Sequence, residues 1–183
     1  IPLGYCNVGT IIGVGENVYD FKVGDRVVSN GSHAEIINIS QNLCCKIPDN
    51  VTDEQAVFTI LGSIGLQGVR LSEPTFGETF LVIGLGLIGL LTSQILIANG
   101  CQVLAIDPDQ SRCDLGKKFG INIVDFNDPI SYCKNHTYGI GVDCAIITAA
   151  TNSQDPITTA SKVGRKRGRI VFVGNVGRDL NRD

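Results

Sequence analysis

The second half of the chain alternates short apolar runs with segments in which apolar residues recur at helical spacing. Such alternation predicts parallel βαβ units joined by right-handed crossovers. Because helices then cover both faces of the sheet, its strands are apolar along their whole length. We therefore expect an α/β fold with a doubly wound parallel sheet in the strand order 3-2-1-4-5. The expected strands cover residues 80–83, 103–106, 121–124, 142–148 and 170–173, and the expected helices cover residues 88–99, 110–119, 129–136 and 156–163.

The first half has the pattern of a β-rich region, which residues 48–50 (Pro-Asp-Asn) close. Thr52 and Gln55 then form a capping-box pattern, which predicts the start of a helix. The helical stretch covers 53–71, and glycines within it predict two helices or one helix with a break. Short strands separated by turn residues are expected at 8–14, 26–28, 34–39 and 43–47, and the interrupting glycines are Gly62, Gly65 and Gly68.

The expected strand at 80–83 leads into a G-x-G-x-x-G sequence that opens the next helix. In a Rossmann dinucleotide-binding unit the first glycine makes a tight turn and the second lets the backbone approach a pyrophosphate. The third glycine lets the helix pack closely on the sheet. Free amides at the helix N-terminus favour the phosphates. The residues expected to bind a dinucleotide cofactor here are Gly84, Gly86, Leu87, Ile88 and Gly89.

Asp107 ends the next strand, roughly 20 residues beyond the loop, where an acidic residue accepts hydrogen bonds from the adenosine ribose. The alternative is that Asp107 only caps the following helix. We favour ribose binding, and because the carboxylate would repel a 2′-phosphate, we expect NAD(H) in preference to NADP(H). Arg112 is the nearby cation that would weaken this preference, but we expect it on the exposed helix face or beside the adenine.

Ligands of open α/β sheets bind beyond the carboxyl ends of the strands. We therefore expect backbone groups at the ends of the fourth and fifth strands to lie near the nicotinamide and its ribose. These groups belong to Thr148, Ala149, Val173 and Gly174. His33 is expected on a strand surface rather than as a catalytic base, and no catalytic residue is assigned.

With these motifs the sequence resembles the medium-chain dehydrogenase/reductase superfamily of the zinc alcohol dehydrogenase type. In that superfamily a GroES-like catalytic domain precedes the cofactor domain, and the substrate lies between them. The resemblance implies that residues 1–50 are the β-rich C-terminal part of a GroES-like domain, that 51–75 are bridging helices, and that 76–183 form an NAD-binding Rossmann domain. Besides the glycine loop it rests on Val-Gly-Asp-Arg-Val at 23–27, His-Ala-Glu at 33–35, Lys-Ile-Pro-Asp at 46–49 and Gly-Arg-Ile-Val-Phe-Val-Gly at 168–174.

Residues 4–7, 61–70 and 146–151 are similar to a subgroup of that superfamily. In this subgroup the dehydrogenase is fused to a second oxidoreductase domain of the Gfo/Idh/MocA type. The resemblance therefore implies a fused domain as one partner of this chain.

The zinc pattern of the superfamily is not kept. The second catalytic zinc ligand of the family is a histidine in a Gly-His-Glu motif, which is Gly4-Tyr5-Cys6 here. No cysteine near 60–62 stands for the third ligand, and the structural-zinc cysteines are missing before His33. Because a catalytic zinc needs three protein ligands, we expect no metal in this segment. We interpret Cys6 as a buried residue rather than a replacement ligand, and Tyr5 as packing rather than lining the substrate cleft.

Composition narrows the function classes. The net charge of −3 and the pI near 5.3 argue against nucleic-acid binding, which needs a basic surface. The uncharged run at 79–98 is broken by glycines, so we expect no membrane-spanning helix.

The seven cysteines form no C-x-x-C pair, which favours free thiols in a cytoplasmic protein. The basic residues Lys162, Arg165, Lys166, Arg167 and Arg169 are expected in a solvated turn at a helix C-terminus.

Ile1 begins the chain and methionine is absent, which suggests a segment of a longer protein. Residues 175–183 are short and polar, so we expect a missing sixth strand and an exposed fifth strand at the edge of the sheet.

These observations predict the NAD(H)-binding part of an oxidoreductase, which transfers hydride between nicotinamide and an alcohol or carbonyl substrate without catalytic zinc. Sugar-derived compounds are among the expected substrates. The alternative is a non-catalytic NAD(H)-binding structural or sensing module fused to another enzyme domain. The expected partners are a small-molecule substrate and either a second copy of the chain or a fused domain.

Overall fold

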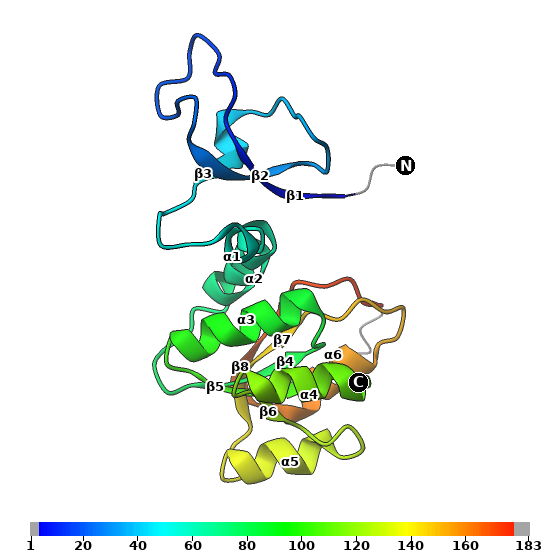
Figure 1. The fold of residues 1–183 in the computed structure, drawn as a ribbon. Helices are drawn as coiled ribbons and strands as arrows, with labels where there is room; N and C mark the ends of the chain where they lie inside the picture. Colours follow the sequence, from blue (N-terminus) through cyan, green and yellow to red (C-terminus); the bar gives the residue numbers. More distant parts are fainter. Residues whose placement is uncertain (1–3, 178–183) are drawn as a thin grey trace. The chain divides into compact units, whose positions relative to one another are not determined.

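The computed structural model describes residues 4–177 of the chain (Figure 1). Two compact units are present, Ile1–Ser63 and Ile64–Asp183. None of the helices described is long and apolar enough to cross a membrane.

The first unit contains a small antiparallel sheet in the order β1-β2-β3. Its strands are β1 (Tyr5–Thr10), β2 (Arg26–Ser32) and β3 (Cys44–Lys46), and the short 3-10 helix η1 (Gln41–Leu43) leads into β3. The core of this unit is formed by Val28, Ile47 and Ala56. Three of the four expected strands are therefore present with shifted bounds.

The strand expected at 34–39 is not formed. The central strand β2 already pairs with β1 on one side and with β3 on the other. The side chain of Ile36 is exposed, whereas Ile37 and Ile39 are half-buried and lie close to Gly31 of β2. Hydrophobic alternation without a neighbouring strand to pair with leaves the segment as a loop.

The helical stretch begins as expected with a capping box, in which Thr52 accepts a hydrogen bond from the backbone of Gln55 and the Gln55 side chain accepts one in return. Two helices follow, α1 (Asp53–Ala56) and α2 (Thr59–Leu71). The break precedes the three glycines, which all lie inside α2. A Cβ atom at Gly65 would lie 2.8 Å from the hydroxyl of Thr92. Gly65 and Gly68 thus serve close packing rather than interruption, whereas Gly62 faces open space.

The second unit is the predicted doubly wound sheet, with five parallel strands in the order β6-β5-β4-β7-β8. In chain order this is 3-2-1-4-5, so the predicted fold class is confirmed. The strands are β4 (Thr79–Ile83), β5 (Gln102–Ile106), β6 (Asn122–Ile123), β7 (Val142–Ile147) and β8 (Gly164–Phe172), and the helices are α3 (Leu87–Ala98), α4 (Gln110–Lys118), α5 (Pro129–His136) and α6 (Asp155–Val163).

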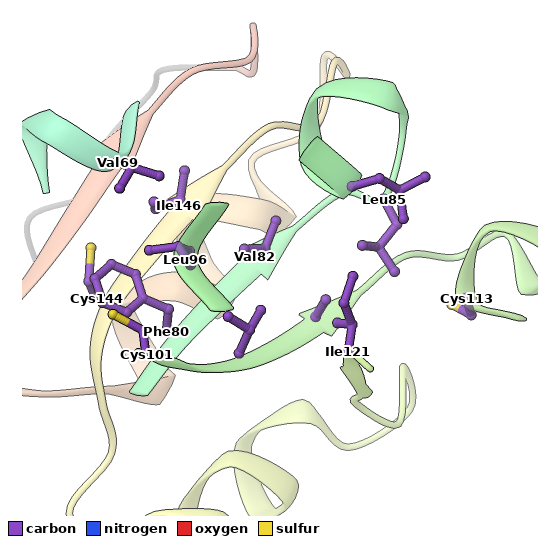
Figure 2. Close-up of a cluster of buried hydrophobic side chains, with 13 residues drawn as sticks. Val69, Phe80, Val82, Leu85, Leu96, Cys101, Cys113, Ile121, Cys144 and Ile146 are labelled. Carbon is purple, nitrogen blue, oxygen red and sulfur yellow. The ribbon is translucent and has the colours of Figure 1, made fainter. Parts of the chain in front are cut away.

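Each face of the parallel sheet is covered by its own apolar cluster. On one face, Phe80 and Val82 of β4 pack with Leu96 of α3 and Cys113 of α4 (Figure 2). On the other face, alternate strand residues pack against Cys133 of α5 and against the apolar side of α6. Burial on both sides explains why the inner strands β4, β5 and β7 are almost entirely apolar.

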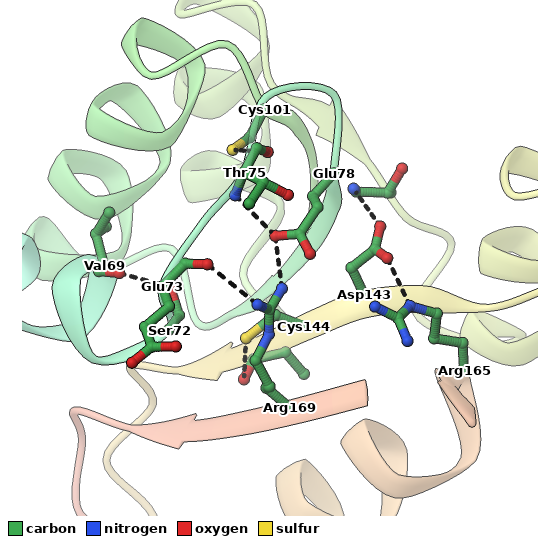
Figure 3. Close-up of polar contacts among 12 residues, drawn as sticks. Val69, Ser72, Glu73, Thr75, Glu78, Cys101, Asp143, Cys144, Arg165 and Arg169 are labelled. Carbon is green, nitrogen blue, oxygen red and sulfur yellow. Dashed lines mark hydrogen bonds and ion pairs between the residues drawn. The ribbon is translucent and has the colours of Figure 1, made fainter. Parts of the chain in front are cut away.

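The basic residues that follow α6 form a strand rather than a solvated turn. Residues 164–172 pair with β7 as β8, with a register shift between Val142 and Cys144. Arg165 lies 2.6 Å from Asp143 of the neighbouring strand β7, and Arg169 lies 2.5 Å from Glu78, which directly precedes β4 (Figure 3). The expectation failed because it considered only the local helix end and not the carboxylates of other strands.

Strand β8 lies at the edge of the sheet as far as the described residues go. Val176 follows it and forms an isolated parallel bridge with Thr151. The predicted absence of a sixth strand concerns residues 175–183, and of these 178–183 lie outside the described residues.

Candidate functional site

The candidate site lies where β4, β5, β7 and β8 end, at the carboxyl edge of the parallel sheet. The glycine loop at 84–89 connects β4 with α3. Asp107 follows β5, Thr148 follows β7, and Val173 follows β8. The strand order therefore brings all the predicted cofactor residues together at the carboxyl ends of the strands, although these residues are far apart in the sequence.

Two glycines of the loop occupy positions that a side chain would not tolerate. Gly84 has a φ of +104°, which is strained for other residues, and a Cβ atom there would lie 2.8 Å from the amide nitrogen of Ala149. At Gly89, a Cβ atom would collide with the carbonyl oxygen of Gly84 and lie 2.8 Å from the Thr148 hydroxyl. The expected tight turn and close helix packing are both present.

Gly86 faces open space, because no atom lies within 4 Å of the position that its Cβ would take. It is the N-cap of α3 and offers no side-chain hydrogen bond to the helix. The first amides of a helix have no intrahelical acceptor, so those at Leu87 and Ile88 are available to an anion. The loop therefore fits the diphosphate of a dinucleotide.

Asp107 is almost fully buried, with 3% of its side chain exposed. One carboxylate oxygen accepts the backbone N–H of Leu85 at 2.7 Å, and the other accepts that of Asp109 at 2.8 Å. The N-cap of α4 is Asp109, which accepts the backbone N–H of Ser111. Capping is thus not the role of Asp107. A carboxylate has about four acceptor positions, so these two backbone donors do not use all of them.

Arg112 lies against this carboxylate, not merely on the outer helix face. Its guanidinium is 3.5 Å from Asp107 and 3.6 Å from Asp109, while about half of its side chain is exposed. Hydrogen bonds from the side chain and backbone of Ser111 hold the pKa of Asp109 below its usual value. The carboxylates of Asp107 and Asp109 therefore share one guanidinium.

The turn after β7 packs directly against the glycine loop. The amides of Thr148 and Ala149 both donate to the carbonyl of Ile83, at 2.9 and 3.0 Å. The amides of Val173 and Gly174 donate in the same way to Ile147. The four residues predicted near the nicotinamide thus stand side by side at the strand ends.

Sequence reasoning missed three groups in this region. They are the hydroxyl of Thr148, which donates to Gly84, the amide of Leu85, and the carboxylate of Asp109. The Asp109-Gln-Ser111 sequence carries an N-cap signal that would have identified Asp109. The other two depend on contacts across the sheet, for which the sequence has no local signal.

The residues at the expected zinc-ligand positions of the first unit do not form a metal site. His33 is exposed, and its Nε2 lies 2.7 Å from the carbonyl oxygen of Tyr5. Cys6 is buried, and burial raises the pKa of its thiol. Across residues 4–177 no group of three or more His, Cys, Asp and Glu side chains is placed to hold a metal ion. These residues therefore do not fit a zinc ion.

A cavity of about 440 Å³ lies in the first unit. It is lined by residues between Asn7 and Cys44, including Val8, Ile36 and Ile37. None of the predicted cofactor residues contributes to it.

Comparison with known proteins places these features in a family. Residues 88–182 match the family model described as zinc-binding dehydrogenase. The (R,R)-butanediol dehydrogenase of Bacillus subtilis is 28% identical over 176 residues, which are 79% of this chain and 51% of that protein. A probable D-xylulose reductase A of Aspergillus fumigatus is 26% identical over 218 residues, covering 96% of this chain and 59% of that protein.

Solved structures agree with the fold. The crystal structure of the Bacillus subtilis butanediol dehydrogenase superposes with a TM-score of 0.81 at 25% identity, covering 95% of this chain and 58% of that one. A mycobacterial protein complexed with NADPH has a TM-score of 0.78 at 27% identity, with 94% and 56% covered. The chain thus spans between half and two thirds of the length of these relatives. The match over residues 88–182, together with the glycine loop and the sheet order, shows that the chain belongs to the zinc-binding dehydrogenase family, within the medium-chain dehydrogenase/reductase superfamily that its motifs resemble.

Proposed function

We propose that this chain is the NAD(H)-binding part of an oxidoreductase that transfers hydride between nicotinamide and an alcohol or carbonyl substrate. The observation that carries the proposal is the glycine loop with Asp107 on the neighbouring strand, whose carboxylate reaches the amide of Leu85. When bound, the nicotinamide supplies or accepts the hydride. The chain contributes binding and orientation.

Each group at the carboxyl edge has a role in this proposal. The free amides at the start of α3 hold the diphosphate, and the open side of Gly86 admits it. Asp107 accepts the hydroxyls of the adenosine ribose with its remaining acceptor positions. Backbone groups of Thr148, Ala149, Val173 and Gly174 orient the nicotinamide end.

The proposed preference for NAD(H) follows from the charge around Arg112. A free guanidinium would attract a 2′-phosphate, but this one is shared by Asp107 and Asp109. The buried carboxylate of Asp107 is only weakly screened by solvent, so it repels a second anion strongly. NADP(H) would therefore meet net repulsion at this position.

The proposed domain organisation and substrate rest on the family. Residues 1–50 are proposed as part of a GroES-like domain, 51–75 as bridging helices and 76–183 as the cofactor domain. The names of the relatives refer to a butanediol and to D-xylulose, which favours a polyol or sugar-derived substrate. We propose that hydride transfer proceeds without a zinc ion held by this chain, because residues 4–177 offer no ligand set for one.

Replacing Asp107 with Ala tests the cofactor assignment. Loss of the ribose acceptor should weaken NAD(H) binding by roughly 1–3 kcal/mol, the scale of hydrogen bonds to a charged group. NADP(H) should lose less affinity or gain some, because the repulsion disappears with the carboxylate. Both affinities are measured by titration of NADH and NADPH fluorescence on the wild type and the variant.

Asp114→Ala is the matched control, because Asp114 is an exposed carboxylate of α4, the helix that follows Asp107, and is paired with Lys117. It should leave both affinities unchanged. The assignment is wrong if the wild type binds NADPH more tightly than NADH, or if Asp107→Ala leaves NADH binding unchanged. A wild type that binds neither dinucleotide would overturn the proposed function itself.

A further inference from the structure

One peptide group of the glycine loop is held at both of its ends by side chains from two different strands. This is the peptide between Gly84 and Leu85. Its carbonyl oxygen accepts a hydrogen bond from the Thr148 hydroxyl at 2.7 Å. Its N–H donates to the carboxylate of Asp107 at 2.7 Å. The carbonyl and N–H of a trans peptide point in opposite directions, and Thr148 and Asp107 follow the two strands that flank β4.

This peptide is one that needs such support. Gly84 has no Cβ and a φ of +104°, so rotation about its backbone bonds meets little steric resistance. The preceding amide is fixed, because the N–H of Gly84 donates to the carbonyl of Ile106 at 2.9 Å. The orientation of the next peptide therefore depends on partners for its own carbonyl and N–H.

The orientation of this peptide matters for the rest of the loop. The Gly84 carbonyl points at Gly89, where even a Cβ atom would collide with it. The same carbonyl must stay turned away from the phosphate side, because a carbonyl oxygen facing a phosphate would repel it. With the peptide held, Gly86 faces open space and the first amides of α3 are clear.

We propose that Thr148 is a positioning residue for the cofactor diphosphate, and that it acts through the Gly84–Leu85 peptide, together with Asp107 on the other side. The proposal rests on the proposed dinucleotide function. It differs from the backbone role of Thr148 at the nicotinamide end, because the side chain acts on the diphosphate that joins the two halves of the cofactor.

The test compares Thr148→Val, which keeps the shape but removes the hydroxyl, with Thr148→Ser, which keeps the hydroxyl. Thr158→Val, an exposed position in α6, is the control for a threonine-to-valine exchange. NAD⁺ and ADP-ribose are titrated calorimetrically. ADP-ribose contains the diphosphate but not the nicotinamide. Thr148→Val should weaken both ligands by the same factor, about three- to tenfold, which is the range of one hydrogen bond, and Thr148→Ser should restore both.

Three results would overturn the proposal: no loss of affinity in Thr148→Val, a loss for NAD⁺ but not for ADP-ribose, or a loss that Thr148→Ser does not restore. A second measurement does not need the cofactor. Hydrogen exchange at the Leu85 amide should accelerate by about three- to tenfold in Thr148→Val, return to the wild-type rate in Thr148→Ser, and leave the Val82 amide unaffected. If the wild type binds neither ligand, the proposed function fails. The hydrogen-exchange measurement still tests Thr148 in that case: an unchanged exchange rate of the Leu85 amide in Thr148→Val would show that the hydroxyl does not restrain the peptide.

Discussion

The cysteines show how strongly the environment of a single residue sets its chemistry. Cys133 and Cys144 are completely buried, one on each face of the parallel sheet. Burial raises the pKa of each thiol to about 11, because the thiolate would have to lose its hydration. Cys45, by contrast, is exposed on β3. All seven cysteines are free in the structure, as the sequence predicts.

Thiol alkylation should therefore distinguish these residues in the native protein. At pH 8 a thiol with a pKa near 11 is ionised in about one molecule in a thousand, and burial also blocks the reagent. We expect iodoacetamide to modify Cys45 quickly and to leave Cys133 and Cys144 unmodified, as measured by peptide mass spectrometry. In denaturant all should react. Rapid native modification of Cys133 or Cys144 would contradict the packing of the sheet.

At the amino ends of the parallel strands, ion pairs as well as backbone hydrogen bonds link β4, β7 and β8. Arg169 of β8 reaches Glu78, which directly precedes β4, and also donates to the carbonyl of Glu73 at 3.1 Å. Asp143 of β7 accepts from Arg165 at 2.6 Å and from the amide of Thr79 at 2.8 Å (Figure 3). Because Glu78 is largely buried, its charge depends on Arg169 for compensation.

Replacing Arg169 with Met should destabilise the protein by about 1–3 kcal/mol, because it leaves the Glu78 carboxylate largely buried without its partner. The variant also loses the contact of the guanidinium with the Phe80 ring, which lies 6.0 Å away. The free energy of unfolding is measured by urea denaturation. Lys166→Met removes an exposed cation of the same strand and should leave stability nearly unchanged. Equal stability of the two variants would show that the buried pair contributes little.

At the scale of the whole molecule, the side chains of the described residues differ from what the family name suggests. The matched family is described as zinc-binding, yet the side chains described in residues 4–177 provide no three-donor cluster. Tyr5 and Cys6 stand where the superfamily has a histidine motif, and Cys6 is buried. A structural or catalytic zinc needs several converging donors, which these positions do not supply.

We therefore expect the purified chain to contain much less than one zinc ion per molecule. Zinc is measured by plasma mass spectrometry after dialysis against buffer with a weak chelator. The thermal midpoint should be the same with and without added zinc, since binding to the native state would raise it. One tightly held zinc per chain, lost in a Cys6→Ser variant, would contradict the zinc-free proposal.

The sequence by itself determined the order of the elements, the fold class and the location of the glycine loop. These features are encoded in contiguous residues, because the period of apolar positions specifies strand or helix and the loop needs glycine at particular backbone conformations. The prediction from the sequence was wrong at residues 34–39 and at the basic residues of β8, because a strand forms only where a neighbouring strand is present to pair with it. The same limit applies to the break between α1 and α2, which the glycines do not set.

Only the tertiary structure decided which side chains meet. The Gly84–Leu85 peptide is bound by two side chains that are distant in the sequence. Asp107 lies 22 residues from Leu85, and Thr148 lies 64 residues from Gly84. Arg169 and Glu78 likewise meet only because β8 lies next to β7 and β7 next to β4. Such contacts depend on strand order and register, where a shift by one residue turns every side chain to the opposite face. Local sequence patterns do not encode that register, and packing of the whole sheet does.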